Sequence, residues 1–100
     1  MNVSVVLPSF NRARLLPITI PTYFQEDVSE VILVDDCSSD NTAEVVKELQ
    51  TRFPTLRYFR NEVNSKQPYT QNVAISKVQS EYIYFGDDDS VLYPGSIRNL

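Results

Sequence analysis

The chain has 100 residues, of which 42% are hydrophobic, so it can build the core of one ordinary domain. Its formal net charge of −4 argues against nucleic-acid binding, which usually needs a basic patch, and its lack of histidine removes the commonest general base. No apolar stretch reaches the roughly 20 residues of a membrane span, and Cys37 is the single cysteine. We therefore expect a cytoplasmic protein with neither a nucleic-acid partner nor a transmembrane segment.

Strands and helices alternate in the first half of the chain. The apolar run over 3–7 predicts a buried strand that ends at Pro8, and 15–24 predicts a helix made irregular by its prolines. A second strand is expected over 30–35. Asn41 and Glu44 then resemble a capping box, which predicts a helix that ends before Pro54. The remaining expected elements are a strand over 56–59, a polar loop over 60–68, a helix over 69–78, a buried strand over 82–85 and a last helix opened by Pro94.

This order of elements predicts an α/β fold. Nearly continuous apolar strands that alternate with helices are typical of a Rossmann-like, mostly parallel sheet with helices on both faces. Ligands of such sheets bind beyond the carboxyl ends of the strands. The polar segments 9–12, 35–36 and 87–89 all follow predicted strands. With two glycines in total, the chain has neither a P-loop nor a dinucleotide fingerprint.

The run Asp87-Asp88-Asp89 is the strongest candidate site. Adjacent carboxylates repel one another and need a counter-charge, and hard divalent cations such as Mg²⁺ prefer oxygen ligands. Alternate residues of an extended backbone point the same way, so Asp87 and Asp89 can share a target while Asp88 points elsewhere, for example to backbone amides. The alternative is a solvated acidic turn.

Two further groups at strand ends have open interpretations. Of Asp35 and Asp36, we expect one to shape the turn that follows and the other to contact a ligand. Phe10 is either a stacking platform or a core residue. Arg12 is either solvated or in contact with a diphosphate.

Four motifs together resemble family 2 glycosyltransferases, which have the GT-A fold. They occupy 5–12, 30–42, 72–75 and 81–89, in the family's order and over nearly the whole chain. The resemblance implies transfer of a sugar, with inversion, from a nucleotide-diphosphate-sugar donor to a saccharide, lipid or protein acceptor. It also implies Mn²⁺ or Mg²⁺ as the cofactor.

The resemblance assigns roles to particular residues. Pro8, Ser9 and Phe10 would frame the base and ribose, and Asp35 or Asp36 would accept a hydrogen bond from the base. The predicted nucleotide-binding set is Pro8, Ser9, Phe10, Arg12, Asp35, Asp36, Asp87 and Asp88, and the predicted metal ligands are Asp87 and Asp89.

The chain departs from the family's pattern at several places. The family often has glycine at the positions of Cys37, Lys66, Ala74 and Ser80, and arginine at that of Gln71. Its catalytic base lies in the second half of the domain. We therefore expect residues 1–100 to be the donor-binding half of a GT-A domain, with the base beyond Leu100.

Two other functions fit part of the pattern. A receiver-like signalling module also has an acidic pocket at strand ends, and phosphorylation of one aspartate by a small phosphodonor would identify it. A nucleotidyltransferase also uses carboxylates and Mg²⁺, and release of pyrophosphate rather than a nucleoside diphosphate would identify that.

Overall fold

The computed structural model describes residues 2–61 and 75–97. In this part of the chain four strands form one sheet in the order β3-β2-β1-β4, and every neighbouring pair is parallel. The strands are β1 (Val3–Ser9), β2 (Val28–Asp35), β3 (Leu56–Arg60) and β4 (Tyr82–Phe85), and the helices are α1 (Leu16–Tyr23) and α2 (Thr42–Arg52). The predicted α/β class and parallel sheet are confirmed.

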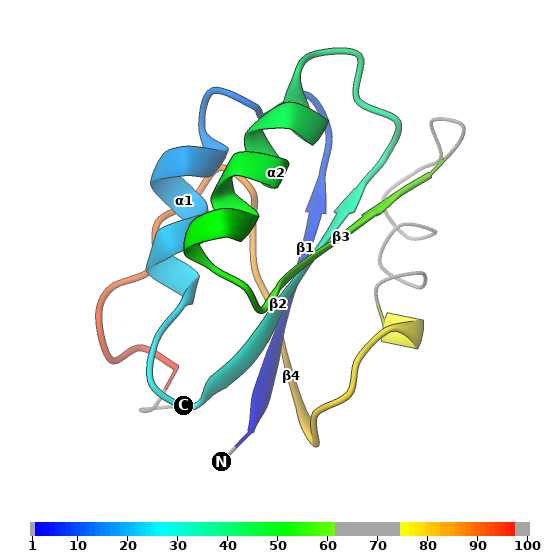
Figure 1. Ribbon diagram of the computed structural model, residues 1–100. Coiled ribbons are helices and arrows are strands. Elements are labelled where there is room, and N and C mark those ends of the chain that lie inside the picture. Colours follow the sequence, from blue (N-terminus) through cyan, green and yellow to red (C-terminus); the bar gives the residue numbers. More distant parts are fainter. Residues whose placement is uncertain (1, 62–74, 98–100) are drawn as a thin grey trace.

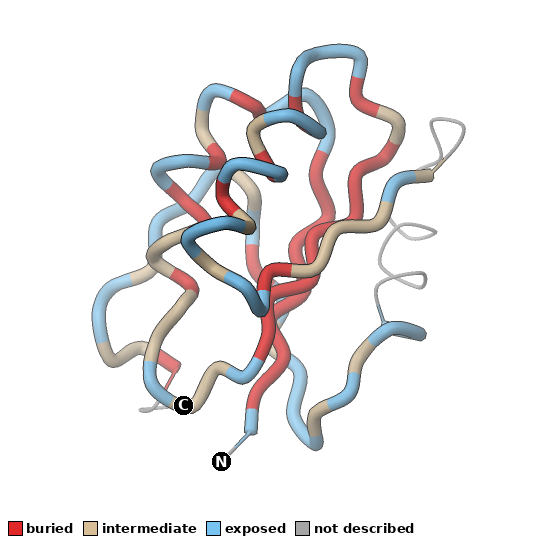
Figure 2. Tube along the Cα trace, viewed as in Figure 1, coloured by how far each residue is buried: buried red, intermediate tan, exposed pale blue. Residues whose placement is uncertain are grey.

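The core lies on both faces of β1 and β2, the two central strands. Figure 1 shows α1 and α2 side by side on one face of the sheet, and Figure 2 shows the buried residues concentrated in β1 and β2. Side chains of the helix-covered face form the larger buried cluster, which consists of Val5, Leu7, Leu16, Ile20, Tyr23, Val31, Leu33, Val46, Leu49 and Leu56. On the opposite face, Val78 packs against Val6, Ile32 and Val34.

The strand β1 does not end at Pro8, as the sequence predicted, but continues to Ser9. Alternate residues of β1 bond to opposite neighbours, and the Val6 carbonyl accepts the amide of Gly86 on the β4 side. The backbone nitrogen of Pro8 therefore faces β4 as well, but the pairing of β1 with β4 has already ended at Val6. Its missing N–H costs the ladder no hydrogen bond.

The predicted capping box at the start of α2 is wrong. Asn41 makes no side-chain hydrogen bond to the helix. Instead Asp40 Oδ1 accepts from the backbone N–H of Thr42 at 3.1 Å. The capping carboxylate is thus one residue earlier than predicted and satisfies one of the unpaired amides of the first turn.

The strand β4 is correctly placed but is not buried. Tyr82, Ile83 and Phe85 are 53%, 39% and 50% exposed, because β4 lies at the edge of the described sheet. Residues 94–97 form turns rather than the start of the predicted last helix.

Most of the predicted loop over 60–68 and helix over 69–78 lies outside the described residues. Residues 75–76 are helical and lie on the side of the sheet opposite to α1 and α2 (Figure 1). No helix in the described ranges has the length and apolar character needed to cross a membrane.

Candidate functional site

Three segments meet at the carboxyl edge of the sheet: 10–15 after β1, 36–41 after β2 and 86–89 after β4. The parallel register places Ser9 beside Asp35 at this edge. Because β1 lies between β2 and β4, both acidic segments flank the segment that carries Phe10 and Arg12.

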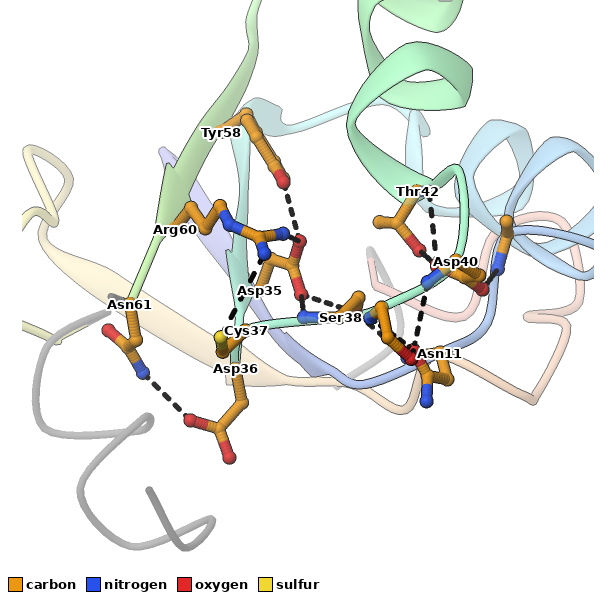
Figure 3. Close-up of polar contacts among 12 residues, drawn as sticks. Asn11, Asp35, Asp36, Cys37, Ser38, Asp40, Thr42, Tyr58, Arg60 and Asn61 are labelled. Atoms are coloured by element: carbon orange, nitrogen blue, oxygen red, sulfur yellow. Dashed lines mark hydrogen bonds and ion pairs between the residues drawn. The ribbon is translucent and has the colours of Figure 1, made fainter. Parts of the chain in front are cut away.

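Asp35 is a buried structural carboxylate, with no exposed surface. Its Oδ2 accepts from the Tyr58 hydroxyl at 2.5 Å and from Arg60 Nη1 at 3.1 Å. Its Oδ1 accepts from the backbone N–H of Ser38 at 2.9 Å and from the Ser38 hydroxyl (Figure 3). Burial, and then the hydrogen bond to Asp35, raise the pKa of Tyr58 to about 12, so this phenol stays a donor. The carboxylate therefore fixes the turn that follows β2.

Asp36 has a different environment. Its backbone N–H donates to the Ser9 carbonyl at 2.8 Å, which extends the sheet ladder by one residue. Its side-chain Oδ1 accepts from Asn61 Nδ2 at 3.1 Å. Figure 3 shows this carboxylate pointing away from Asp35, past the edge of the sheet. Asp36 is therefore better placed than Asp35 to contact a ligand.

Cys37 has a backbone φ of 61°, in the left-handed region that glycine adopts most readily. A glycine at this position would adopt the same φ without strain. The Cys37 sulfur lies 3.8 Å from Arg60 Nη2.

Asn11 joins the segment after β1 to the segment after β2. It also has a left-handed φ, of 52°. Its backbone N–H donates to Ser38 Oγ at 2.8 Å, and its side-chain Oδ1 accepts from the backbone N–H of Ser39 at 2.8 Å. A longer contact of 3.4 Å runs from the Asp40 N–H to the same oxygen.

Asp40 completes the connection from the other side. Its Oδ2 accepts from the backbone N–H of Ala13 at 3.1 Å, while its Oδ1 caps α2 at Thr42. Removal from water favours the protonated form, but the hydrogen bonds from Thr42 and Ala13 outweigh it and hold the pKa of Asp40 below its usual value. We call the contacts among Asn11, Ala13, Ser38, Ser39 and Asp40 the Asn11–Asp40 clasp.

Helix α1 holds the backbone of the acidic segment 86–89. The Tyr23 hydroxyl donates to the Asp87 carbonyl and accepts from the Asp87 N–H, both at 3.1 Å. Thr19 Oγ1 donates to the Asp88 carbonyl at 3.2 Å. Gly86 packs so closely that a Cβ atom there would lie 2.6 Å from the Tyr23 ring.

Asp88 accepts a hydrogen bond from a backbone amide, as expected, although residues 88–89 lie in a turn and not in the extended backbone that the expectation assumed. Its Oδ2 accepts from the backbone N–H of Phe10 at 3.3 Å, and its Oδ1 lies 3.6 Å from Arg12 Nε. Burial raises the pKa of Asp88 above its usual value, although the Ser9 hydroxyl, the Phe10 amide and the Arg12 guanidinium oppose the shift. Asp88 thus joins the acidic segment to the segment after β1.

Asp87 and Asp89 both expose their side chains to solvent, and Asp89 Oδ2 lies 3.9 Å from Arg12 Nη2. In the described ranges no three acidic or cysteine side chains gather closely enough to hold a metal ion. Two exposed carboxylates nevertheless fit Mg²⁺ or Mn²⁺ chemically, because a Mg²⁺ site typically uses one or two carboxylates plus waters and substrate phosphates.

Pro8, Ser9 and Phe10 lead from the core to this edge. Phe10 is 44% exposed, so the core alternative for it is wrong. The Ser9 hydroxyl is buried and makes no hydrogen bond of ordinary geometry to a described residue. It nevertheless lies close enough to Asp88 to act against the rise in the pKa of that carboxyl.

Sequence reasoning missed four residues that build this edge: Asn11, Asp40, Tyr58 and Arg60. Asparagine is enriched in the left-handed region, which is a weak signal for Asn11. Tyr58 and Arg60 are two residues apart on a strand and so share a face, but nothing in the sequence pairs that face with Asp35.

Comparison with known proteins supports the family resemblance found in the sequence. Residues 4–100 match the model of a family described as glycosyl transferase family 2. Over 98% of its length the chain is 35% identical to a GalNAc(5)-diNAcBac-PP-undecaprenol beta-1,3-glucosyltransferase of Campylobacter jejuni, of which it covers 33%.

Solved structures agree on the fold. The crystal structure of S. aureus TarS 1-349 in complex with UDP-GlcNAc is 27% identical, with a TM-score of 0.87 over 99% of this chain and 30% of that one. A mannosyltransferase from Pyrobaculum calidifontis, in complex with GDP-Man and Mn²⁺, has a TM-score of 0.90 at 23% identity and covers 98% of this chain and 30% of its own. The chain thus spans about a third of the length of these proteins.

Proposed function

Because the chain belongs to glycosyl transferase family 2, we propose that residues 1–100 form the donor-binding half of a GT-A enzyme that transfers a sugar from a nucleotide-diphosphate-sugar. The observation that carries the proposal is the meeting of an exposed aromatic ring, an outward carboxylate and an exposed acidic pair at one sheet edge. The ring and the carboxylate suit a nucleobase, and the acidic pair suits a metal-bound diphosphate.

The base and ribose take the side of the edge nearest to β1 and β2. Phe10 offers its ring for stacking, and Asp36 accepts a hydrogen bond from a base N–H. Asp35 is excluded from this role because both its oxygens already accept hydrogen bonds inside the protein. The Ser9 hydroxyl, which lies beside Asp88, supplies a further polar contact.

The diphosphate takes the side nearest to β4. Asp87 and Asp89 would hold Mn²⁺ or Mg²⁺, which when bound would neutralise the charge that develops on the departing nucleoside diphosphate. Arg12, whose side chain is 44% exposed beside Asp88 and Asp89, is close enough to the same side to contact a phosphate oxygen. Inversion at the sugar and the identity of the acceptor, a saccharide, lipid or protein hydroxyl, complete the proposal. We assign the base that activates the acceptor to the enzyme beyond Leu100.

Calorimetry with UDP and GDP tests the metal and diphosphate assignment. Binding is expected with Mn²⁺ and is expected to disappear with excess chelator, because carboxylates alone repel phosphate. Asp89→Ala should remove the metal dependence more completely than Asp88→Ala, since Asp88 is turned inward to the Phe10 amide. Equal affinity for either nucleotide with and without metal would overturn the assignment.

Phe10→Ala tests the stacking assignment. Loss of an aromatic pair should weaken nucleoside diphosphate binding by about 0.5–1.5 kcal/mol. The melting temperature should change little, because the ring is already 44% exposed. A large fall in melting temperature with unchanged affinity would contradict this role.

A further inference from the structure

We propose that the Asn11–Asp40 clasp is a positioning device for the nucleobase, which sets the distance between Phe10 and Asp36. The inference rests on the proposed function, because Phe10 and Asp36 are its base-contacting groups. The side chains of Asn11 and Asp40 need not touch the ligand, because they act through the two loops that they join.

The two base-contacting groups come from separate loops, so something must fix one loop against the other. Asp36 is anchored to β1 by its own amide, which donates to the Ser9 carbonyl at 2.8 Å. Phe10 is held on the β4 side by the 3.3 Å bond from its amide to Asp88. On the β2 side, the next residue, Asn11, provides the corresponding attachment to the loop after Asp36.

The clasp reaches the buried carboxylate behind the site. The Ser38 hydroxyl donates to Asp35 and accepts from the Asn11 amide, so the segment after β1 is tied to the same carboxylate that Tyr58 and Arg60 hold. The position of Phe10 therefore also depends on β3, which is two strands away from β1 in the sheet. Figure 3 shows this row of contacts running from Tyr58 to Asn11.

The chemistry of base recognition needs this precision. Stacking fixes a base in one plane, and a hydrogen bond to its edge is directional within that plane, so the ring and the carboxylate must hold a set spacing. Binding groups work best when held within about 0.5 Å of their productive geometry by packed or hydrogen-bonded neighbours. The clasp consists of such hydrogen bonds.

The two clasp side chains to be changed, those of Asn11 and Asp40, lie outside the hydrophobic core, which helps to separate their role from folding. Asn11, Ser39 and Asp40 are all exposed, and neither buried cluster contains a clasp residue. Asn11→Gly removes the side-chain contacts while suiting the left-handed backbone at φ 52°. Asp40→Asn keeps one acceptor, for either the Ala13 amide or the Thr42 amide, and Asp40→Ala removes both.

The test measures two affinities in each variant of the full chain, both with Mn²⁺: that for UDP or GDP, whichever the wild type binds, and that for inorganic pyrophosphate. Asn11→Gly and Asp40→Ala should weaken nucleoside diphosphate binding about 3- to 10-fold, the loss expected when a stacked pair is misaligned. Pyrophosphate binding should stay within about twofold, and Asp40→Asn should fall between Asp40→Ala and the wild type.

A matched control is Gln25→Ala, which loses hydrogen bonds to the Tyr93 carbonyl and the Ile97 amide at the far end of α1. It should change neither affinity. A double variant adds a second readout: if the clasp acts through Phe10, Asn11→Gly should cost little further affinity in a Phe10→Ala background.

The outcomes separate the two proposals. If the wild type binds UDP or GDP and the clasp variants bind it equally well, the clasp inference is overturned and the proposed function stands. Equal losses for pyrophosphate, or full additivity with Phe10→Ala, also overturn it, because the effect would then be general. If the wild type binds neither nucleotide, the proposed function fails and the inference fails with it.

Discussion

Asp35 and Asp36 are adjacent and chemically identical, yet the structure predicts opposite consequences when each is changed to asparagine. Asp35→Asn places an NH₂ group either against the Ser38 N–H or against the Tyr58 hydroxyl and the Arg60 guanidinium. On one side of the new carboxamide, two hydrogen-bond donors then face each other in a fully buried position. A buried donor left without an acceptor costs about 1–3 kcal/mol, and the lost charge adds to this.

We therefore expect Asp35→Asn to lower the free energy of unfolding by about 2–4 kcal/mol. For a domain of this size each kcal/mol corresponds to about 4–8 °C, so the melting temperature should fall by at least about 8 °C. Asp36→Asn keeps an oxygen for the Asn61 amide, so although Asp36 is only 8% exposed, this change should cost less stability than Asp35→Asn.

Nucleotide binding should show the reverse pattern. Asp36→Asn puts a donor against a base N–H, and we expect about a tenfold loss of UDP or GDP affinity, equivalent to about 1.4 kcal/mol. Thermal unfolding followed by circular dichroism gives the stability, and calorimetry well below the melting temperature gives the affinity. An Asp35→Asn variant that melts within about 2 °C of the wild type but no longer binds nucleotide would refute the reasoning, because Asp35 would then be the base-reading residue.

Three other changes test the architecture of the edge. Gly86→Ala should destabilise the fold by about 1–3 kcal/mol, since its Cβ would lie 2.6 Å from both Leu7 and Tyr23; a wild-type melting temperature would contradict this. Cys37→Gly should stabilise by up to about 1 kcal/mol, as glycine relieves the cost of the left-handed φ of 61°, whereas Cys37→Ser should not. Removal from water raises the pKa of Glu30, but hydrogen bonds outweigh it and lower the pKa overall. Its stabilising contribution is therefore complete above pH 4.5, its ordinary pKa, and is lost as pH falls below it. Urea titrations at pH 6 and pH 3.5 should show a smaller difference for Glu30→Gln than for the wild type.

The elements of the fold were largely predictable because they depend on local patterns. Largely apolar runs identified the four strands of the described sheet, and the order of strands and helices indicated that the sheet is parallel. The errors at Pro8 and Asn41 have a common cause. Proline is excluded from a strand only where its N–H is needed, and that depends on where β4 ends. Capping by Asp40 rather than Asn41 depends on the path of the loop.

The candidate site was predictable in its acids but not in its supports. A run of aspartates after a strand is visible in the sequence, and the contact of Asp88 with a backbone amide was expected, but the turn at 88–89 was not. Which of Asp35 and Asp36 is structural was not predictable, because the answer lies in Tyr58 and Arg60 on β3, more than 20 residues away. Contacts of this range are a property of the assembled sheet.

The two sides of the edge differ in how they are held, and this difference bears on how a ligand would bind. The base side is fixed by hydrogen bonds that converge on the buried Asp35. On the diphosphate side, helix α1 holds the backbone, but the Asp89 carboxylate is half exposed and only 3.9 Å from an exposed guanidinium. Such surface pairs contribute little and are screened by salt. Binding of the diphosphate should therefore weaken as salt rises, whereas stacking on Phe10 should not, because an uncharged ring carries no counter-ion.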